Sequence, residues 1–129
     1  MSVLGSKLLL VEDSSVLATR VAEIIGEIPE IDLVAVVDSE TAALRELKGR
    51  RIQILVLDLH LKDGSGFGIL RAVSAAPEKP YVLVLTNHDS ATYESRAIEL
   101  GASAFLDKAR DFDRLPEILK KIVQAGHRQ

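Results

Sequence analysis

The sequence predicts one α/β domain, built on a doubly wound parallel sheet of five strands in the order 2-1-3-4-5. First, five short apolar runs alternate with five segments of helical periodicity. Second, the runs are apolar at successive positions, which is typical of strands buried on both faces of a parallel sheet. Third, the connections are short, and short right-handed crossovers favour this strand order. We expect a single domain over residues 1–129, with its core at about 7–125 and no effector domain.

Composition narrows the class of protein. A chain of 129 residues is long enough to bury a core without cross-links. Sixteen basic against nineteen acidic residues leave a net charge of −3, so we expect no direct nucleic-acid binding. The absence of cysteine excludes disulfides and thiolate metal sites, and indicates a reducing compartment. No apolar run approaches the roughly 20 residues of a membrane span, and the start lacks a signal-peptide pattern. We expect a cytoplasmic protein with no membrane association.

The first strand and helix are predicted from apolar spacing. Lys7–Val11 is a buried-strand run that ends in the acidic pair Glu12-Asp13, and Ser14 or Ser15 can cap the next helix. Pro29 stops that helix. Its apolar stripe has offsets of 0, 4, 7, 8 and 11, at Leu17, Val21, Ile24, Ile25 and Ile28.

The second unit follows the same plan. Ile31–Val37 is predicted to be a strand, and Asp38-Ser39 opens a helix. In that helix Leu44 and Leu47 are expected to face inward, and Gly49 is expected to end it.

The central strand is predicted from the run Ile52–Leu57, and Asp58 follows it directly. A charged side chain is almost never left unpaired inside such a core, so Asp58 is expected where the strand emerges. Open α/β sheets bind their ligands at that carboxyl edge. The glycine-rich run Gly64–Gly68 is no phosphate-binding fingerprint and is interpreted as a turn that opens the third helix. That helix carries its apolar stripe at Phe67, Leu70 and Val73.

The last two strands are predicted at Tyr81–Leu85, before Thr86, and at Ala102–Leu106, before Lys108. The helix between them begins after Asp89 or Ser90, runs to Gly101 and has the weakest apolar stripe in the chain. The final helix begins near Asp111 or Asp113, so that Pro116 falls in its first turn. Its inward face is made by Leu115, Ile118, Leu119, Ile122 and Val123.

This strand order brings polar side chains to one edge of the sheet. The order of the strands reverses between strands one and three, so Glu12-Asp13 and Asp58 are expected to meet there, flanked by Thr86 and Lys108. Three neighbouring carboxylates repel one another unless a cation neutralises them. Oxygen ligands without a histidine or cysteine cluster suit Mg²⁺. Lys108 offers a charge and Thr86 a hydroxyl to a phosphoryl group, so the set is suited to forming an aspartyl phosphate on Asp58.

These five residues, each at a strand end and in this order, resemble the receiver domain of two-component response regulators. The resemblance extends from about Lys7 to Ala125 and implies the flavodoxin-like receiver fold. It implies that Asp58 is phosphorylated by a sensor histidine kinase or a phosphotransfer protein, as one step of a phosphorelay. It further implies Mg²⁺ bound by Asp13, Asp58 and the backbone carbonyl of His60, with Glu12 acting through a water molecule.

The resemblance also implies a conformational output. Thr86 would move toward the phosphoryl group, and Phe105 would rotate inward as a coupled aromatic switch. The face made by the fourth helix, fifth strand and fifth helix would bind a downstream protein or effector domain, while homodimerisation through it stays open. A receiver is a signalling domain rather than an enzyme, since it catalyses only its own phosphoryl transfer and dephosphorylation.

The chain departs from the family pattern at four positions. Lys62 and Ala109 stand where receivers often have proline, Asn87 where a small residue is common, and Phe105 where tyrosine is commoner. A cis peptide bond before a residue other than proline costs about 3 kcal/mol. We therefore expect a trans bond after Lys108 and a locally different loop from there to Asp111.

Other interpretations stay open at this point. Asp58 can simply cap a turn, Lys108 can be a solvated residue, Thr86 can be strand filler, and Phe105 can be ordinary core. His60 and His88 are expected to be exposed loop residues rather than metal ligands, with a role in phosphoryl lifetime as a hypothesis.

Two other functional classes fit the same fold: an interaction module, and a small enzyme or cofactor carrier. The main alternative function is a receiver-like interaction module that is not phosphorylated. A flavin carrier is disfavoured because the loop after the first strand is acidic. A haloacid-type phosphatase is disfavoured because His60 stands where that class needs an aspartate.

Overall fold

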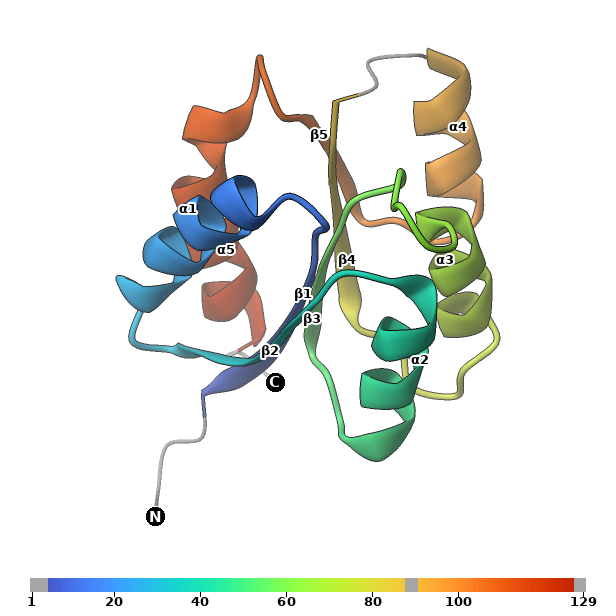
Figure 1. The fold of residues 1–129 in the computed structure, drawn as a ribbon. Helices are drawn as coiled ribbons and strands as arrows, with labels where there is room; N and C mark the ends of the chain where they lie inside the picture. Colours follow the sequence, from blue (N-terminus) through green and yellow to red (C-terminus); the bar gives the residue numbers. More distant parts are fainter. Residues whose placement is uncertain (1–4, 88–90, 127–129) are drawn as a thin grey trace.

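The computed structural model describes residues 5–87 and 91–126, which form one parallel sheet with helices on both faces (Figure 1). The strands are β1 (Ser6–Val11), β2 (Ile31–Val37), β3 (Ile54–Leu57), β4 (Tyr81–Thr86) and β5 (Ala104–Asp107). The helices are α1 (Ser15–Gly26), α2 (Glu40–Gly49), α3 (Gly66–Ser74), α4 (Ala91–Glu99) and α5 (Leu115–Gly126), with a short 3-10 turn, η1 (Phe112–Arg114), before α5. The strand order β2-β1-β3-β4-β5 confirms the predicted fold class.

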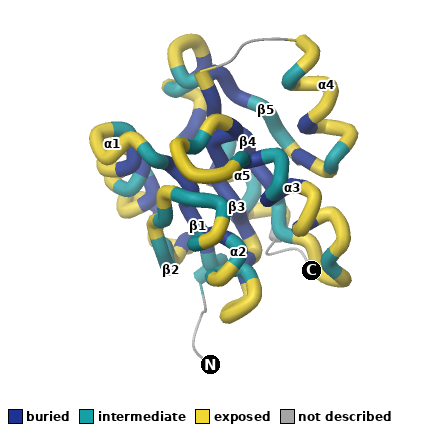
Figure 2. The backbone as a smooth tube through the Cα atoms, turned by 45° about the vertical axis from the view of Figure 1, so that its right-hand side comes forward, coloured by how far each residue is buried: buried dark blue, intermediate teal, exposed yellow. Residues whose placement is uncertain are grey.

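The sheet separates two apolar layers, because successive strand residues point to opposite faces. Helices α1 and α5 cover one face, and α2, α3 and α4 cover the other (Figure 1). Figure 2 shows the strands buried in the centre and the outer surfaces of the helices exposed. The first layer contains Leu8, Leu10, Val56, Leu83 and Leu119, and the second contains Leu9, Leu55, Leu57, Ile69 and Val84.

Short-range sequence signals set most helix ends. The hydroxyls of Ser14, Ser39 and Ser65 accept backbone N–H bonds at the starts of α1, α2 and α3. Gly101 follows α4 with a φ of 103°, a left-handed conformation that favours glycine. Pro116 is the second residue of α5, as expected. The predicted caps of α4, Asp89 and Ser90, lie outside the described residues.

Three local expectations were wrong. Strand β3 begins at Ile54 rather than Ile52, although Ile52 is still buried. Strand β5 begins two residues later than predicted, at Ala104, and ends one residue later, at Asp107, whose Cα pairs with that of Thr86. Leu44 belongs to neither apolar layer, whereas Leu47 packs against the second one as predicted.

No helix within the described part of the chain has the length and apolar character that crossing a bilayer requires.

Candidate functional site

The pairing of the central strands brings the acidic residues together. Val11, the last residue of β1, pairs with Leu57, the last residue of β3. The backbone N–H of Asp58 continues the ladder by donating to the Val11 carbonyl at 3.1 Å. The residues that follow both strands therefore leave the sheet side by side, as the sequence predicted.

Glu12, Asp13 and Asp58 form an acidic cluster at this edge of the sheet. Each offers a carboxylate oxygen, and these oxygens lie within 4.8 Å of one another. Glu12 and Asp58 are only 4% and 5% exposed, whereas Asp13 is half-buried. Closely spaced carboxylate oxygens, one of them partly open to solvent, suit a small divalent cation with oxygen preference.

The Lys108 ammonium provides a positive charge within this acidic cluster. Its Nζ lies 2.8 Å from Asp58 Oδ2 and 2.8 Å from Glu12 Oε1. Burial raises the pKa of the Glu12 carboxyl above its ordinary value, although hydrogen bonds from Lys108 and from the Ser14 N–H oppose this. Burial lowers the pKa of Lys108, but the hydrogen bonds to Asp58 and Glu12 outweigh it, so this pKa is raised. The ammonium therefore stays charged between two carboxylates at neutral pH.

The other oxygen of Asp58 is held by neutral donors. The Thr86 hydroxyl donates to Oδ1 at 3.0 Å, and the backbone N–H of His60 donates to the same atom at 3.1 Å. Thr86 is fully buried at the end of β4. Both carboxylate oxygens of Asp58 are thus held by hydrogen bonds, at the carboxyl edge of the sheet. A carboxylate held in this way can act as a nucleophile toward an electrophile that enters the acidic cluster.

Lys108 lies in a turn that the carboxylates of Asp107 and Asp111 hold through hydrogen bonds to the backbone. Asp107 Oδ1 accepts hydrogen bonds from the backbone N–H groups of Ala109 at 2.8 Å and Arg110 at 2.9 Å. In return, Asp111 Oδ2 accepts from the Asp107 N–H at 3.0 Å. Both carboxylates are buried, and the peptide bond after Lys108 is trans, as predicted. The loop is therefore locked by hydrogen bonds that need a backbone N–H at Ala109.

The loop after Asp58 is held by Glu40 at the start of α2. Glu40 Oε1 accepts from the Ser65 N–H at 2.8 Å, and the Glu40 N–H donates to the Asp63 carbonyl at 3.0 Å. Gly64 has a φ of 91°, and a Cβ there would clash with the Glu40 side chain. The glycine-rich run Gly64–Gly68 is therefore a turn that packs closely between α2 and α3. It is also the start of α3, as the sequence predicted.

Replacing Gly66 by alanine is expected to destabilise the fold by about 1–3 kcal/mol. A Cβ at this position would meet the Asp58 carbonyl oxygen and would lie 2.7 Å from Leu59 Cα, and both are backbone atoms that cannot rotate away. Urea unfolding measures the loss. Gly26→Ala is the matched control, because nothing lies within 4 Å of a Cβ there. An equal effect of the two substitutions would contradict the close approach at Gly66.

Comparison with known families decides the classification. The family model of the response regulator receiver domain matches residues 8–120. The chain belongs to this family.

Individual relatives of this receiver domain agree with the assignment. It is 30% identical to the transcriptional regulatory protein UhpA of Salmonella typhimurium over 117 residues, which are 91% of this chain and 58% of that protein. It is 33% identical over 125 residues to a protein-glutamate methylesterase/protein-glutamine glutaminase of Syntrophus aciditrophicus, covering 92% of this chain and 36% of that protein. The receiver domain thus spans about half the length of the curated relatives it matches.

The fold is also found among solved structures. The response regulatory domain of protein mrkE from Klebsiella pneumoniae superimposes with a TM-score of 0.87 at 21% identity. The match covers 95% of this chain and 99% of that one. At this identity the likeness supports the receiver fold alone.

The structure assembles the predicted site of the receiver domain. Glu12, Asp13, Asp58, Thr86 and Lys108 all lie at one edge of the sheet, with the contacts given above. This placement leaves a solvated role for Lys108 and a strand-filling role for Thr86 without support. Asp58 does cap the turn that follows it, through the His60 N–H, but it also contacts Lys108 and Thr86.

The remaining predicted residues lie around this site. Phe105 is half-buried against the layer of α2, α3 and α4. Asn87 and His60 are exposed, as predicted for His60. The binding of a metal by the His60 carbonyl stays a prediction, and His88 lies outside the described residues.

Sequence reasoning missed four residues around the receiver site. The sequence pattern places Asp107 just after the fifth strand and Asp111 near the start of the last helix, and it predicts no role for Glu40. Tyr93 of α4 was also missed; its ring centroid lies 5.3 Å from that of His60 and 6.1 Å from that of Phe67. Two aspartates at this spacing, Asp107 and Asp111 on either side of Ala109, are a sequence pattern that indicates a turn capped by carboxylates.

The Asp111 carboxyl is expected to make receiver stability depend on pH. The hydrogen bond from the Asp107 N–H, with help from Arg110 and Arg114, holds the pKa of Asp111 below its ordinary value of 3.8. A lowered pKa stabilises the fold at all pH values above the ordinary pKa, and this contribution is lost as pH falls through the folded-state pKa. Asp111→Asn is therefore expected to be destabilising at pH 7 and progressively less so below about pH 4.

Chemical denaturation of wild type and Asp111→Asn across this pH range measures the effect. Asp113→Asn is the control, since Asp113 is an exposed aspartate two residues away. A penalty for Asp111→Asn that stays constant down to pH 2 would contradict the ionic origin of the stabilisation.

Proposed function

We propose that this receiver domain is a phosphorylation-dependent switch in which Asp58 accepts a phosphoryl group from a histidine kinase or a phosphotransfer protein. The observation that carries the proposal is the environment of the Asp58 carboxylate. It lies at the end of the central strand, with the Lys108 ammonium at 2.8 Å from one oxygen and the Thr86 hydroxyl at 3.0 Å from the other. The ammonium and the hydroxyl could donate hydrogen bonds to the negatively charged oxygens of an aspartyl phosphate.

In the proposed reaction, an oxygen of the Asp58 carboxylate attacks phosphorus and forms a P–O bond. The bond from phosphorus to the donor breaks at the same centre, and its electron pair leaves with the donor's imidazole nitrogen or, for a small-molecule donor, with acetate. The negative charge of the carboxylate is thereby replaced by that of the phosphoryl oxygens. Lys108 and Thr86 are positioned to donate hydrogen bonds to these phosphoryl oxygens, because both already donate hydrogen bonds to the Asp58 carboxylate.

The acidic cluster fits Mg²⁺, which is part of the proposal. Glu12, Asp13 and Asp58 offer carboxylate oxygens within 4.8 Å of one another. Asp13, Asp58 and the His60 carbonyl are the proposed direct ligands, and Glu12 is proposed to act through a water molecule. When bound, Mg²⁺ would neutralise the carboxylates and the incoming phosphoryl group. Asp13 accepts a hydrogen bond from the Lys62 N–H at 2.7 Å, which orients its carboxylate beside Asp58.

The proposed output runs through β4 and β5. Thr86 and Asp107 are partners in the β4–β5 ladder, and the Lys108 N–H donates to the Thr86 carbonyl at 2.8 Å. A move of Thr86 toward a phosphoryl group would shift this pairing and the nearby Phe105. The face of α4, β5 and α5 is therefore the proposed docking surface for a downstream protein or effector domain. Because the proposed phosphoryl donors are cytoplasmic, the proposal places the chain in the cytoplasm.

Backbone NMR with Mg²⁺ and beryllofluoride, a phosphoryl mimic, tests the switch. Shift changes are expected at the Asp58 loop and also over Glu94–Lys108, and Asp58→Asn should remove them. Changes confined to the Asp58 loop would contradict the proposed output. No response to the mimic and no Mg²⁺ binding would favour the alternative, a receiver-like interaction module that is not phosphorylated.

A further inference from the structure

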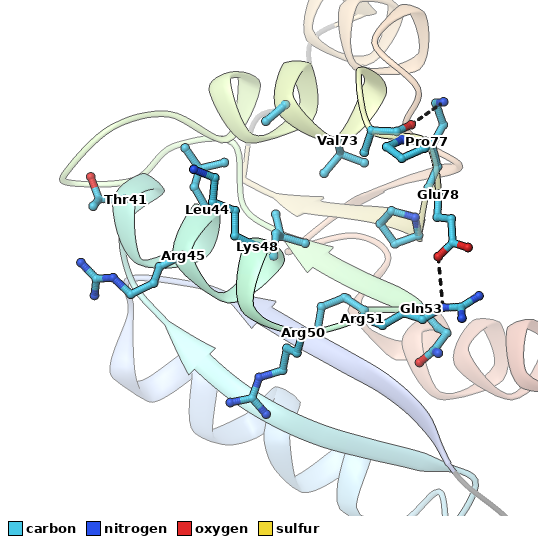
Figure 3. Close-up of a pocket in the computed structure, with 16 residues that line it drawn as sticks. Thr41, Leu44, Arg45, Lys48, Arg50, Arg51, Gln53, Val73, Pro77 and Glu78 are labelled. Carbon is cyan, nitrogen blue, oxygen red and sulfur yellow. Dashed lines mark hydrogen bonds and ion pairs between the residues drawn. The ribbon is translucent and has the colours of Figure 1, made fainter.

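A groove of about 1210 Å³ lies at the edge of the sheet opposite the acidic cluster (Figure 3). Its walls are α2 on one side and the end of α3 with the following loop on the other. Ile52 and Gln53, just before β3, and Pro80, just before β4, also line it. Strand β3 separates this groove from Asp58, and four residues of strand extend about 13 Å. The groove is therefore a separate site from the proposed phosphorylation site.

Part of the groove is apolar, and one of the apolar side chains that line it belongs to neither core layer. Leu44 is half-buried but belongs to neither apolar layer of the fold. Ile52 and Val73 are buried, and they line the groove beside it. The sequence predicted Leu44 to face the core; the structure instead leaves it available to a partner.

The charge of the groove is opposite to that of the whole chain. Five basic residues and one acid, Glu78, line it, while the chain carries a net charge of −3. Arg50 pairs with Glu46 at 2.9 Å and Arg51 with Glu78 at 3.3 Å. The basic residues are Arg45, Lys48, Arg50, Arg51 and Lys79.

Three of these cations, Arg45, Lys48 and Lys79, have no ion-pair partner among residues 5–87 and 91–126, and Lys79 Nζ donates to the Ala76 carbonyl at 3.0 Å. Arg45 and Lys48 therefore remain for a ligand. Leu44 and Lys48 are four residues apart on α2, so they share one face of the helix. Figure 3 shows them on the side of α2 that faces α3, with Arg45 projecting outward. An apolar contact and a positive charge are thus presented together.

We propose that this groove binds an acidic amphipathic segment of a partner protein. Its apolar side chains would contact Leu44 and Val73, and its carboxylates would lie against Lys48, with Arg45 at the outer rim of the groove. The volume exceeds the range of about 300–1,000 Å³ that is usual for small-ligand pockets, so a peptide segment fits better than a small anion. Helical segments bind grooves through apolar residues spaced at i, i+3, i+4 and i+7, which suits this combination.

The binding is expected in the unphosphorylated protein. A fluorescein-labelled synthetic peptide, with a helical stripe of leucines and glutamates elsewhere, is the probe, and the full chain is used without Mg²⁺. Fluorescence anisotropy should show saturable binding, and backbone NMR should show shifts over residues 41–48 and 72–79. Because no phosphoryl donor is present, failure here leaves the proposed chemistry of Asp58 untouched.

Charge reversal gives the decisive comparison. Lys48→Glu is expected to weaken peptide binding by about tenfold or more, because it replaces an attraction by a repulsion. Lys120→Glu, an exposed lysine of α5, is the matched control and should bind the peptide nearly as well as the wild type.

Three outcomes would overturn the proposal. One is the absence of saturable binding, or shifts elsewhere on the surface. Another is equal binding of a peptide with lysines in place of its glutamates. The third is inorganic tripolyphosphate binding the same residues more tightly than the peptide, which would identify a site for small anions.

Discussion

Replacing Lys108 by methionine is expected to lower the free energy of unfolding by about 3–5 kcal/mol in the absence of Mg²⁺. The substitution keeps much of the side-chain volume but removes the cation that Glu12 and Asp58 share at 2.8 Å each. Two buried carboxylates would then face each other unpaired, and the pKa of Glu12, already raised by burial, would rise further. Urea unfolding in the presence of EDTA measures the loss.

Added Mg²⁺ is expected to restore part of the stability of this variant, since a divalent cation can replace the lost ammonium among the carboxylates. The same titration should show tighter Mg²⁺ binding to Lys108→Met than to the wild type, because Lys108 no longer repels the ion. Lys62→Met is the control, since Lys62 is exposed in the loop after Asp58 and only its backbone N–H contacts the cluster. Unchanged stability of Lys108→Met would show that the ion pair is not structural.

Ala109→Pro is expected to be destabilising by about 2–3 kcal/mol, although proline is common at this position in receivers. In this chain, the Ala109 N–H donates to the buried carboxylate of Asp107 at 2.8 Å, and proline has no N–H to donate. Proline also restricts the backbone of the preceding residue, Lys108. The ammonium would then be displaced from Asp58, so phosphorylation should slow as well.

A double-mutant cycle separates this cause from general strain. If Asp107 is the reason, Ala109→Pro should cost much less stability in an Asp107→Ala background than in the wild type. Unfolding free energies of the four proteins give the coupling. Strict additivity would contradict the role of Asp107, and a neutral Ala109→Pro would show that the loop accepts the geometry of other receivers.

Strand order and the two apolar layers could be predicted from the sequence, because both depend on local patterns. Buried runs such as Leu8–Val11 and Ile54–Leu57 are apolar on both faces, and short connections leave few topologies. The meeting of Glu12 and Asp58 follows from that topology alone. The predicted strand order was confirmed, whereas the predicted bounds of β3 and β5 were wrong by one or two residues.

The contacts around the site depend on tertiary structure, and periodicity does not encode them. Asp107 is the last residue of β5, and its carboxylate accepts hydrogen bonds from N–H groups of the next loop, which the apolar pattern does not predict. Leu44 has the spacing of a core residue, yet α2 is positioned so that it lines a groove. The spacing of apolar residues defines a helix face, and only the packed structure shows what that face meets.

Intact-mass spectrometry after incubation with acetyl phosphate tests the central claim most directly. The proposal predicts a single phosphoryl adduct that requires Mg²⁺ and is absent from Asp58→Asn. Backbone NMR with Mg²⁺ alone, run on the same samples, shows whether the acidic cluster binds the ion. An adduct that persists in Asp58→Asn would contradict the assignment of the acceptor. No adduct together with no Mg²⁺ binding would contradict the phosphorylation switch itself.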